Sequence, residues 1–212
     1  MNEIVESRNH DWPRMVFGVV WELATYLNIL YLLLSLPLGT FYFVFLVTGL
    51  ALGLGLAIVW VGLPILLLML LAIYGLTGFE RLLAIHLLGQ EVAPLRDVEP
   101  EESAWDWLQG VATTPATWKG LVFLLFKFPF GIFSFVITVT LLTTSLAFIF
   151  APLFILTGGV VDFGFWVGDT LGEGLLCTLL GMILHLVSLH ILNAVAWVWG
   201  ILSQALLGKS LA

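Results

Sequence analysis

Lys127 is a basic residue placed inside a long apolar run, eight positions after Lys119. An ammonium group in such a place has three alternatives. Its alkyl stem reaches toward polar lipid headgroups, it pairs with a carboxylate such as Glu22 or Glu80, or it holds a lipid phosphate. Lys127 is therefore a candidate binding residue whose partner the sequence leaves open.

Several polar side chains also interrupt the last apolar run. On a helix, His190, Asn193 and Trp197 fall on one face, and His185 and Ser188 form a second pair one turn earlier. Hydrogen bonds between helices of a bundle are one interpretation, and sensing of protons or a ligand is the other. His185 and His190 are therefore candidate ligand-binding residues.

The stretch from residue 157 to residue 169 mixes glycines, aromatic side chains and acids. Its candidate ligand-binding residues are Asp162, Phe165, Trp166 and Asp169, which would suit an apolar or cationic molecule at a membrane surface. The alternative is a re-entrant or interface-lying segment whose aromatic residues sit among the headgroups.

No set of residues in the sequence has the spacing of a catalytic or metal site. The four histidines are scattered, and neither a phosphate-binding glycine loop nor a nucleophile with a nearby base occurs. We expect no enzymatic activity, no metal and no cofactor. The net charge of −7 argues against nucleic acid as a partner.

Composition predicts that these residues lie in a membrane protein. The 212 residues have a mean hydropathy of +1.11 and only 10% are charged, which is far more apolar surface than a soluble domain of this size buries. The uncharged run 27–74 is long enough for two crossings, which we place at about 27–48 and 55–75 with a glycine-rich turn between them. Polar residues within 75–89 alternate with apolar ones as in a helix that leaves the bilayer along its surface, and 15–25 is interpreted as an interfacial lead-in helix.

A motif that occurs twice indicates an internal repeat. Residues 37–48 and 129–140 both fit P-x-G-x-F-x-F-V-x-x-V-T, at an offset of 92 residues. Near the end of the chain the offset becomes 119, since Leu206-Leu207-Gly208 matches Leu87-Leu88-Gly89 and Gly181 matches Gly62. About 27 residues are thus inserted in the second copy, between roughly 145 and 172.

The predicted fold is an all-α membrane protein with four transmembrane helices, arranged as two tandem parallel two-helix repeats with interfacial helices and a non-cytoplasmic insert. It forms a single membrane domain over 1–212. Repeat one covers about 25–89, an acidic cytosolic linker about 90–116, and repeat two about 117–208. The third and fourth spans are placed at about 120–142 and 176–200, and Pro37, Pro64 and Pro129 are expected to kink their helices.

The basic residues predict the orientation in the membrane. Neither hairpin tip carries Lys or Arg, and the basic residues fall on the side of the termini and the linker: Arg8, Arg14, Arg81, Arg96, Lys119 and Lys209. Because basic residues remain on the cytoplasmic side, both termini are expected in the cytoplasm of a multi-pass protein of the cell membrane. The insert, with Asp162, Asp169 and Glu173, is then outside.

Several motifs together resemble a known family. Leu36-Pro37-Leu38-Gly39, Val61-Gly62-Leu63-Pro64, Glu80-Arg81, Pro115-Ala116-Thr117-Trp118, Phe128-Pro129-Phe130-Gly131 and Ala151-Pro152-Leu153 occur in the order and spacing of the bacterial and archaeal "putative sensor" family. The resemblance runs from about Tyr31 to Gly208. It implies a membrane module of the kind that stands before histidine kinases, with cytoplasmic termini. This chain has no phosphoacceptor helix and no ATP-binding domain, so we expect its output to pass to a separate protein.

The leading hypothesis is a membrane-embedded sensory or signal-input module. It would detect a membrane or outer-surface cue and signal through its cytosolic face, formed by 76–116 and the C-terminal tail, to a separate regulatory partner. A homodimer would also fit. The alternatives are a small transporter or lipid-handling protein, which predicts a water-lined cavity with Lys127, His185 or His190, and a structural membrane subunit without a ligand.

Overall fold

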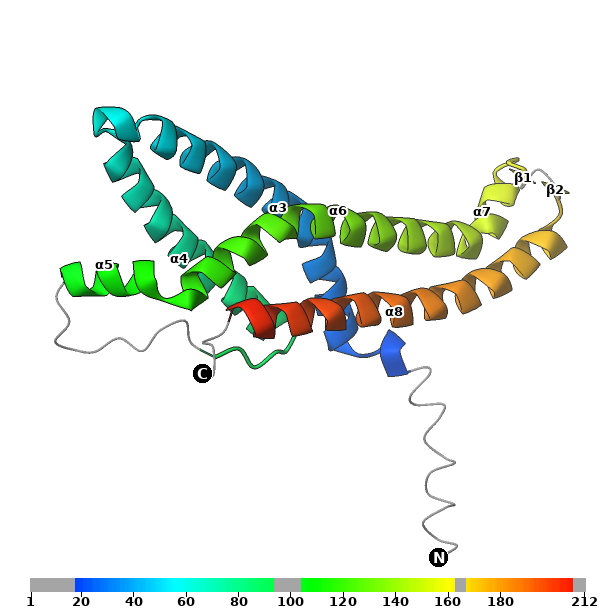
Figure 1. The fold of residues 1–212 in the computed structure, drawn as a ribbon. Coiled ribbons are helices and arrows are strands. Elements are labelled where there is room, and N and C mark those ends of the chain that lie inside the picture. The colour runs from blue at the N-terminus through cyan, green and yellow to red at the C-terminus, as the bar shows by residue number, and fades with distance from the viewer. Residues whose placement is uncertain (1–17, 94–103, 163–166, 208–212) are drawn as a thin grey trace, which may run out of the picture. The chain divides into compact units, whose positions relative to one another are not determined.

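The computed structural model describes residues 18–93, 104–162 and 167–207. Four long helices account for most of them: α3 (Leu23–Gly55), α4 (Gly62–Leu87), α6 (Pro115–Ile149) and α8 (Leu171–Leu207) (Figure 1). Each is long and apolar enough to cross a membrane, so the prediction of an all-α, multi-pass membrane protein with four spans is confirmed. At 33 residues α3 is about 50 Å long, so these helices exceed the hydrocarbon thickness of a bilayer.

The first hairpin turns later than its sequence predicts. Gly49 and Gly53, expected in the turn, lie within α3, and the chain reverses through a 3-10 helix η2 (Ala57–Val59) and Trp60, whose φ is 64°. The two glycines face side chains of α4: an added Cβ at Gly49 would meet Met69, and one at Gly53 would meet Leu66. They therefore allow α3 and α4 to approach closely, a role that glycine often has between membrane helices.

The surface helix expected over 75–89 is wrong, because α4 continues without a break to Leu87. Glu80, expected on the polar side of that helix, is fully buried. The polar alternation in this segment therefore marks a side chain that faces the protein interior. After α4, Gly89 adopts a positive φ of 61°, and the N–H groups of Leu88 and Gln90 both donate to the Ala84 carbonyl.

A short helix leads into the third span. Helix α5 (Ala104–Thr113) contacts α4, where Trp107 and Tyr74 meet edge to face with ring centroids 5.6 Å apart. Its last carbonyls are satisfied by side chains of the following helix: Thr117 donates to the Val111 oxygen and the Trp118 indole to the Ala112 oxygen. Pro115 begins α6, a position where proline loses no helical hydrogen bond.

The insert of the second hairpin contains no further crossing in its described part. Residues 145–149 finish α6, and they are followed by α7 (Ala151–Leu156) and a two-stranded antiparallel hairpin, β1 (Val161–Asp162) and β2 (Val167–Gly168). Helix α8 then begins with a capping box, in which the Glu173 carboxylate accepts from the Thr170 N–H and hydroxyl and the Glu173 N–H donates back to the Thr170 hydroxyl.

The three prolines have different places in their helices. Pro37 and Pro129 lie inside α3 and α6, where the ring removes one backbone hydrogen bond. Pro64 lies in the first turn of α4, where the N–H would have no helical partner, so no kink is required there. Kinks at Pro37 and Pro129 stay predictions.

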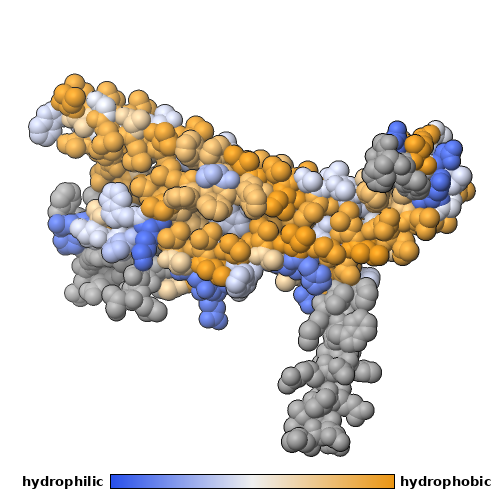
Figure 2. Space-filling model, turned by 45° about the vertical axis from the view of Figure 1, so that its right-hand side comes forward, coloured by the Kyte–Doolittle hydropathy of each residue, from blue (hydrophilic) through white to orange (hydrophobic). Residues whose placement is uncertain are grey.

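Two compact units divide the chain. Unit one takes its described residues from Met1–Tyr26 and Val136–Ala194, and unit two from Leu27–Phe135 and Val195–Ala212. Apolar side chains dominate the visible face of the long helices (Figure 2). Between 17% and 33% of the most apolar window of each span is buried, which leaves the rest for lipid. The tandem repeat and the predicted repeat boundaries stay predictions.

Some predictions fall outside the described residues. These are the first residues of the lead-in helix, 15–17, and the residues Arg8, Arg14, Arg96, Lys209, Phe165 and Trp166. The rest of the lead-in segment is described and is not one helix: a 3-10 turn η1 (Gly18–Val20) comes first, and α3 starts at Leu23.

Candidate functional site

Lys127 of α6 forms a buried ion pair with Glu80 of α4 inside unit two. Both side chains are fully buried, and the second carboxylate oxygen of Glu80 accepts a hydrogen bond of 2.7 Å from the hydroxyl of Tyr42 on α3. The ammonium also donates to the Tyr31 hydroxyl, 3.3 Å away. Of the alternatives for Lys127, the structure therefore selects pairing with Glu80.

Three aromatic rings lie close to the ammonium. The Lys127 nitrogen lies 4.4 Å from the ring centroid of Tyr31, 5.6 Å from that of Trp199 and 5.9 Å from that of Phe123. Tyr31 and Phe123 each meet Trp199 edge to face. Cation–π attraction adds to the ion pair where water is absent. The cluster, which we call the polar core, thus joins residues of α3, α4, α6 and α8 within unit two.

Two glycines bring α3 and α6 together beside the polar core. A Cβ at Gly39 would lie 2.6 Å from the Lys127 carbonyl oxygen, and one at Gly131 would lie 2.5 Å from the Ser35 carbonyl oxygen. Gly131 follows Gly39 by 92 positions, and Lys127 follows Ser35 by the same offset. Each copy of the repeated motif therefore presents its glycine to the same place on the other copy, which supports the predicted repeat.

The offset of 119 residues, found near the end of the chain, also links two hydrogen bonds between helices. Tyr42 donates to Glu80, and Trp199 donates through its indole N–H to the Ser134 hydroxyl, 2.8 Å away. Ser134 follows Tyr42 by 92 residues and Trp199 follows Glu80 by 119. One connection between helices is thus made twice, once with a carboxylate and once with an indole. In the predicted repeat alignment, Glu80 and Lys127 correspond to Trp199 and Ser35, so the charge pair has no counterpart in the other copy.

Gly62 and Gly181, which are 119 residues apart, also have contacts at corresponding positions. A Cβ at Gly62 would meet the Ala57 nitrogen and the Leu56 carbonyl carbon, within unit two. A Cβ at Gly181 would meet the Ile149 nitrogen and the Phe148 carbonyl carbon, within unit one. Since these partners are 92 apart and the glycines 119 apart, the extra residues of the second copy fall between 149 and 181.

The segment that follows α4 is hydrogen-bonded to the end of α8. Residues 88–93, which we call the strap, follow α4, and the Arg81 guanidinium donates to the carbonyls of Val92 and Ala93 at 2.8 to 3.0 Å. Within the strap, the side-chain oxygen of Gln90 (Oε1) accepts a hydrogen bond of 2.9 Å from the side-chain amide of Gln204 on α8. Arg81 directly follows Glu80, so one turn of α4 carries both the ion pair and the anchor of the strap.

The polar residues of the last span form bonds between helices, as one of their two interpretations expects. In unit one, Ser145 of α6 and the Nδ1 atom of His185 lie 3.0 Å apart, and Asn193 donates to Thr25 of α3 at 3.0 Å. His190 is exposed on the surface of α8. A sensing role for His185 and His190 stays a prediction.

The predicted ligand residues of the insert are only partly described. Asp162 ends β1 opposite Val167, and the Asp169 N–H donates to the Glu173 carboxylate. A cavity of about 360 Å³ beside them is lined by apolar residues of α6, α7, β1 and α8, including Phe154 and Cys177. A ligand at the insert stays a prediction.

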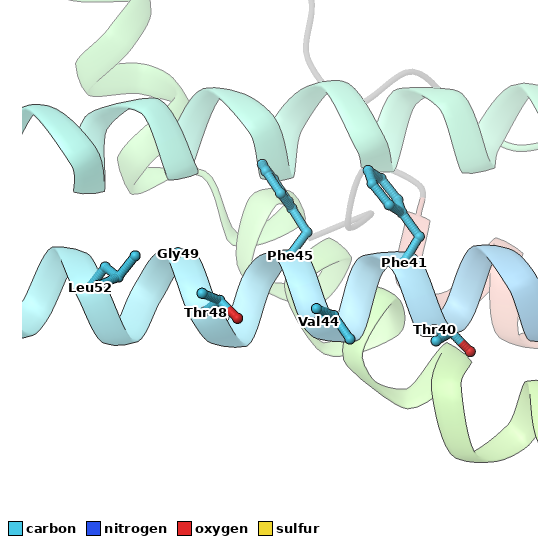
Figure 3. Close-up of a pocket in the computed structure, with 7 residues that line it drawn as sticks. All are labelled: Thr40, Phe41, Val44, Phe45, Thr48, Gly49 and Leu52. Atoms are coloured by element: carbon cyan, nitrogen blue, oxygen red, sulfur yellow. The ribbon is translucent and has the colours of Figure 1, made fainter.

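A further cavity, of about 500 Å³, lies on α3 itself (Figure 3). Phe41 and Phe45 lie on one side of it with their rings stacked at 5.7 Å, and Thr40 and Thr48 lie on another side. All its lining residues come from α3, so it is one face of a helix and not a site built from several elements.

Sequence reasoning missed the neutral members of the polar core: Tyr31, Tyr42, Phe123 and Trp199. Tyr42 and Trp199 could have been found, because each replaces a residue of a different type in the repeat alignment, Ser134 and Glu80. Among the described residues, no group of three or more His, Cys, Asp or Glu side chains is arranged to hold a metal.

The Tyr42–Glu80 and Trp199–Ser134 hydrogen bonds are expected to contribute unequally to stability. Tyr42→Phe removes a hydrogen bond to a charged acceptor and is expected to lower the free energy of unfolding by about 2 kcal/mol. Ser134→Ala removes a bond between neutral groups and is expected to cost about 1 kcal/mol. Reversible unfolding of both variants in mixed micelles measures the difference. Equal costs would mean that the Tyr42 bond gains nothing from the charge of Glu80.

Comparison with known proteins adds one match. A family model described as "Putative sensor" matches residues 31–207, which include every residue of the polar core and the strap. No curated protein and no solved structure matches the chain.

Proposed function

Since the chain belongs to the "Putative sensor" family, we propose that it is a sensory module of the cell membrane whose polar core controls the position of the strap. The family and the four apolar helices fit a membrane sensory module. The proposal goes further: a cue in the membrane or at its outer surface changes the packing around Glu80 and Lys127, and the strap carries that change to a separate cytosolic partner.

The observation that carries the proposal is the position of Glu80 beside Arg81. A charge buried within a membrane span is costly and usually serves a function. Glu80 holds α4 to α3 and α6 through Tyr42 and Lys127, and Arg81 holds the strap. Any rotation or shift of α4 that loosens the ion pair therefore also moves the anchor of the strap and the contact between Gln90 and Gln204.

The polar core has the properties of a two-state element. Leaving one partner of a buried ion pair without its counter-charge is costly, whereas neutralising both partners together is not, so half-neutralised arrangements are unfavourable. A cue needs only to bind the two arrangements with different affinity in order to shift their populations. No step in this scheme requires catalysis or a cofactor, and we propose that the protein is not an enzyme.

The alternatives receive less support. A transporter with Lys127 in its pathway requires this side chain to reach water, but Lys127 is fully buried and forms an ion pair with Glu80. A structural subunit would not need a charge pair that only one copy of the repeated contact contains.

The strap can be tested directly, because the sequence contains a single cysteine, Cys177. Spin labels at the exposed positions Glu91 and Ala205, in a Cys177→Ser background in nanodiscs, report the distance between strap and α8 by pulsed electron resonance. We expect Arg81→Ala to broaden this distance distribution. Arg81→Lys should restore it only in part, because an ammonium lacks the fork of the guanidinium that reaches two carbonyls.

The same labels test the link to the polar core. The double variant Glu80→Gln, Lys127→Met is expected to shift the distance distribution, and Ser134→Ala, which touches the matching bond outside the ion pair, is expected to leave it unchanged. A distribution that is identical in wild type and in the double variant would show that the ion pair does not control the strap, and the proposed function would fail.

A further inference from the structure

A groove in unit two has no role in the description so far. It has a volume of about 570 Å³, within the range of small-molecule sites, and is formed by residues of α3, α4, α5 and α6. Its lining is apolar and consists mostly of leucines, among them Leu54, Leu63 and Leu67. All three are exposed, so the groove is open along the side of the first hairpin.

The groove is continuous with the packing that supports the polar core. Ile73 and Leu121 line it, and both belong to or pack against a buried apolar cluster that also contains Tyr42 and Leu124. Tyr42 is the residue that donates to Glu80. An occupant that pushes on Ile73 or Leu121 therefore acts on the hydroxyl that orients the carboxylate.

We propose that this groove binds one acyl chain of a membrane phospholipid, and that this chain is the cue of the proposed sensory function, on which this second part rests. The medium around exposed leucines on membrane-spanning helices is lipid. The described residues that line the groove include no charged side chain to orient a compact polar ligand, so an apolar chain is the chemistry that it fits. Trp118 lines the groove, and Lys119 is the next residue in the sequence. Indole is favoured in the headgroup region, and an ammonium attracts the lipid phosphate.

Neighbouring leucines of α4 provide a matched pair of variants. Leu67 lines the groove, whereas Leu68 is more exposed and does not line it. Leu67→Trp fills the groove with an indole, and Leu68→Trp adds the same bulk elsewhere on the same helix. Both are reconstituted in nanodiscs with a phospholipid that carries a diazirine at the end of one chain, and the crosslinked peptides are identified by mass spectrometry after irradiation.

We expect the wild type and Leu68→Trp to be labelled in the segments around residues 63–73 and 118–121. Leu67→Trp should lower this labelling by about five-fold or more, because a filled groove excludes the chain. Labelling that is spread evenly over all lipid-exposed leucines and is unchanged by Leu67→Trp would show ordinary boundary lipid and overturn the groove site. Stronger labelling by a diazirine-bearing adamantane than by the phospholipid would overturn the acyl chain as its occupant.

The spin-label distance between Glu91 and Ala205 separates the groove from the proposed function. Crosslinking alone decides whether the chain occupies the groove. A Leu67→Trp protein that loses the lipid but keeps the wild-type distance would leave the lipid site in place and remove its role as the cue.

Discussion

Lys127→Met is expected to lower the free energy of unfolding by about 3 to 5 kcal/mol, the largest effect of any substitution considered for this protein. The methionine fills the space of the lysine stem, so the cost does not come from a cavity. It comes from Glu80, whose carboxylate is fully buried and is left with the hydrogen bond from the Tyr42 hydroxyl once the ammonium is gone. Reversible unfolding in mixed micelles measures the change.

Two further variants determine whether this cost belongs to the ion pair. Lys119→Met removes a partly buried lysine from the same helix and should change stability by less than about 0.5 kcal/mol. Adding Glu80→Gln to Lys127→Met removes the unpaired charge and keeps an oxygen for Tyr42, so the double variant should regain most of the loss. A Lys127→Met protein as stable as Lys119→Met would show that Lys127 is not paired in the membrane.

The rescue matters for function as well as for stability. If a neutral pair at positions 80 and 127 folds nearly as well as the charged one, the charges are not needed to hold the helices together. In the predicted repeat alignment, Trp199 and Ser134 correspond to Glu80 and Tyr42, and the bond between them joins two neutral groups. Such a result would support the proposal that the charge pair serves to switch between a closed and an open contact and not to stabilise the fold.

Glu80 shows what the sequence predicts and where that prediction stops. The spacing of polar residues from Glu80 to His86 indicates a helix, and a helix is present. Periodicity alone does not say whether the polar face meets water or the protein interior. At a membrane surface it meets water, but within a span it turns inward, because the surrounding lipid is the apolar phase. The surface helix was therefore predicted wrongly, although the helix itself was predicted correctly.

The glycines of the first hairpin show the same limit. Gly49 and Gly53 predict a turn if glycine is considered only as a weak helix former. In the structure they remain helical and make room for Met69 and Leu66 of α4. The number of spans depends on the length of the apolar runs and was predictable, whereas the position of each turn depends on which helices approach one another. The polar core, which joins residues as far apart in the sequence as Tyr31 and Trp199, depends on that packing too.

Alanine at Gly39 is expected to cost about 3 kcal/mol, because its Cβ would lie 2.6 Å from the Lys127 carbonyl oxygen and 2.9 Å from the Phe128 Cα. These are backbone atoms, so no side chain can move aside, and α3 and α6 have to separate next to the ion pair. Gly131→Ala should cost a similar amount, since it meets the Ser35 carbonyl at 2.5 Å. The same unfolding measurement in micelles applies.

The double variant Gly39→Ala, Gly131→Ala distinguishes one shared crossing from two independent contacts. Once the first alanine has separated α3 from α6, the second meets a gap that is already wider, so the double variant should cost clearly less than the sum of the two. Gly75→Ala is the control, because a Cβ at this position in α4 meets nothing within 4 Å and should leave stability unchanged or slightly raised. Strict additivity would mean that the glycines relax separately. The contact between the two repeat motifs would then not be a single packing unit. A separation of α3 and α6 at one glycine would not change their contact at the other.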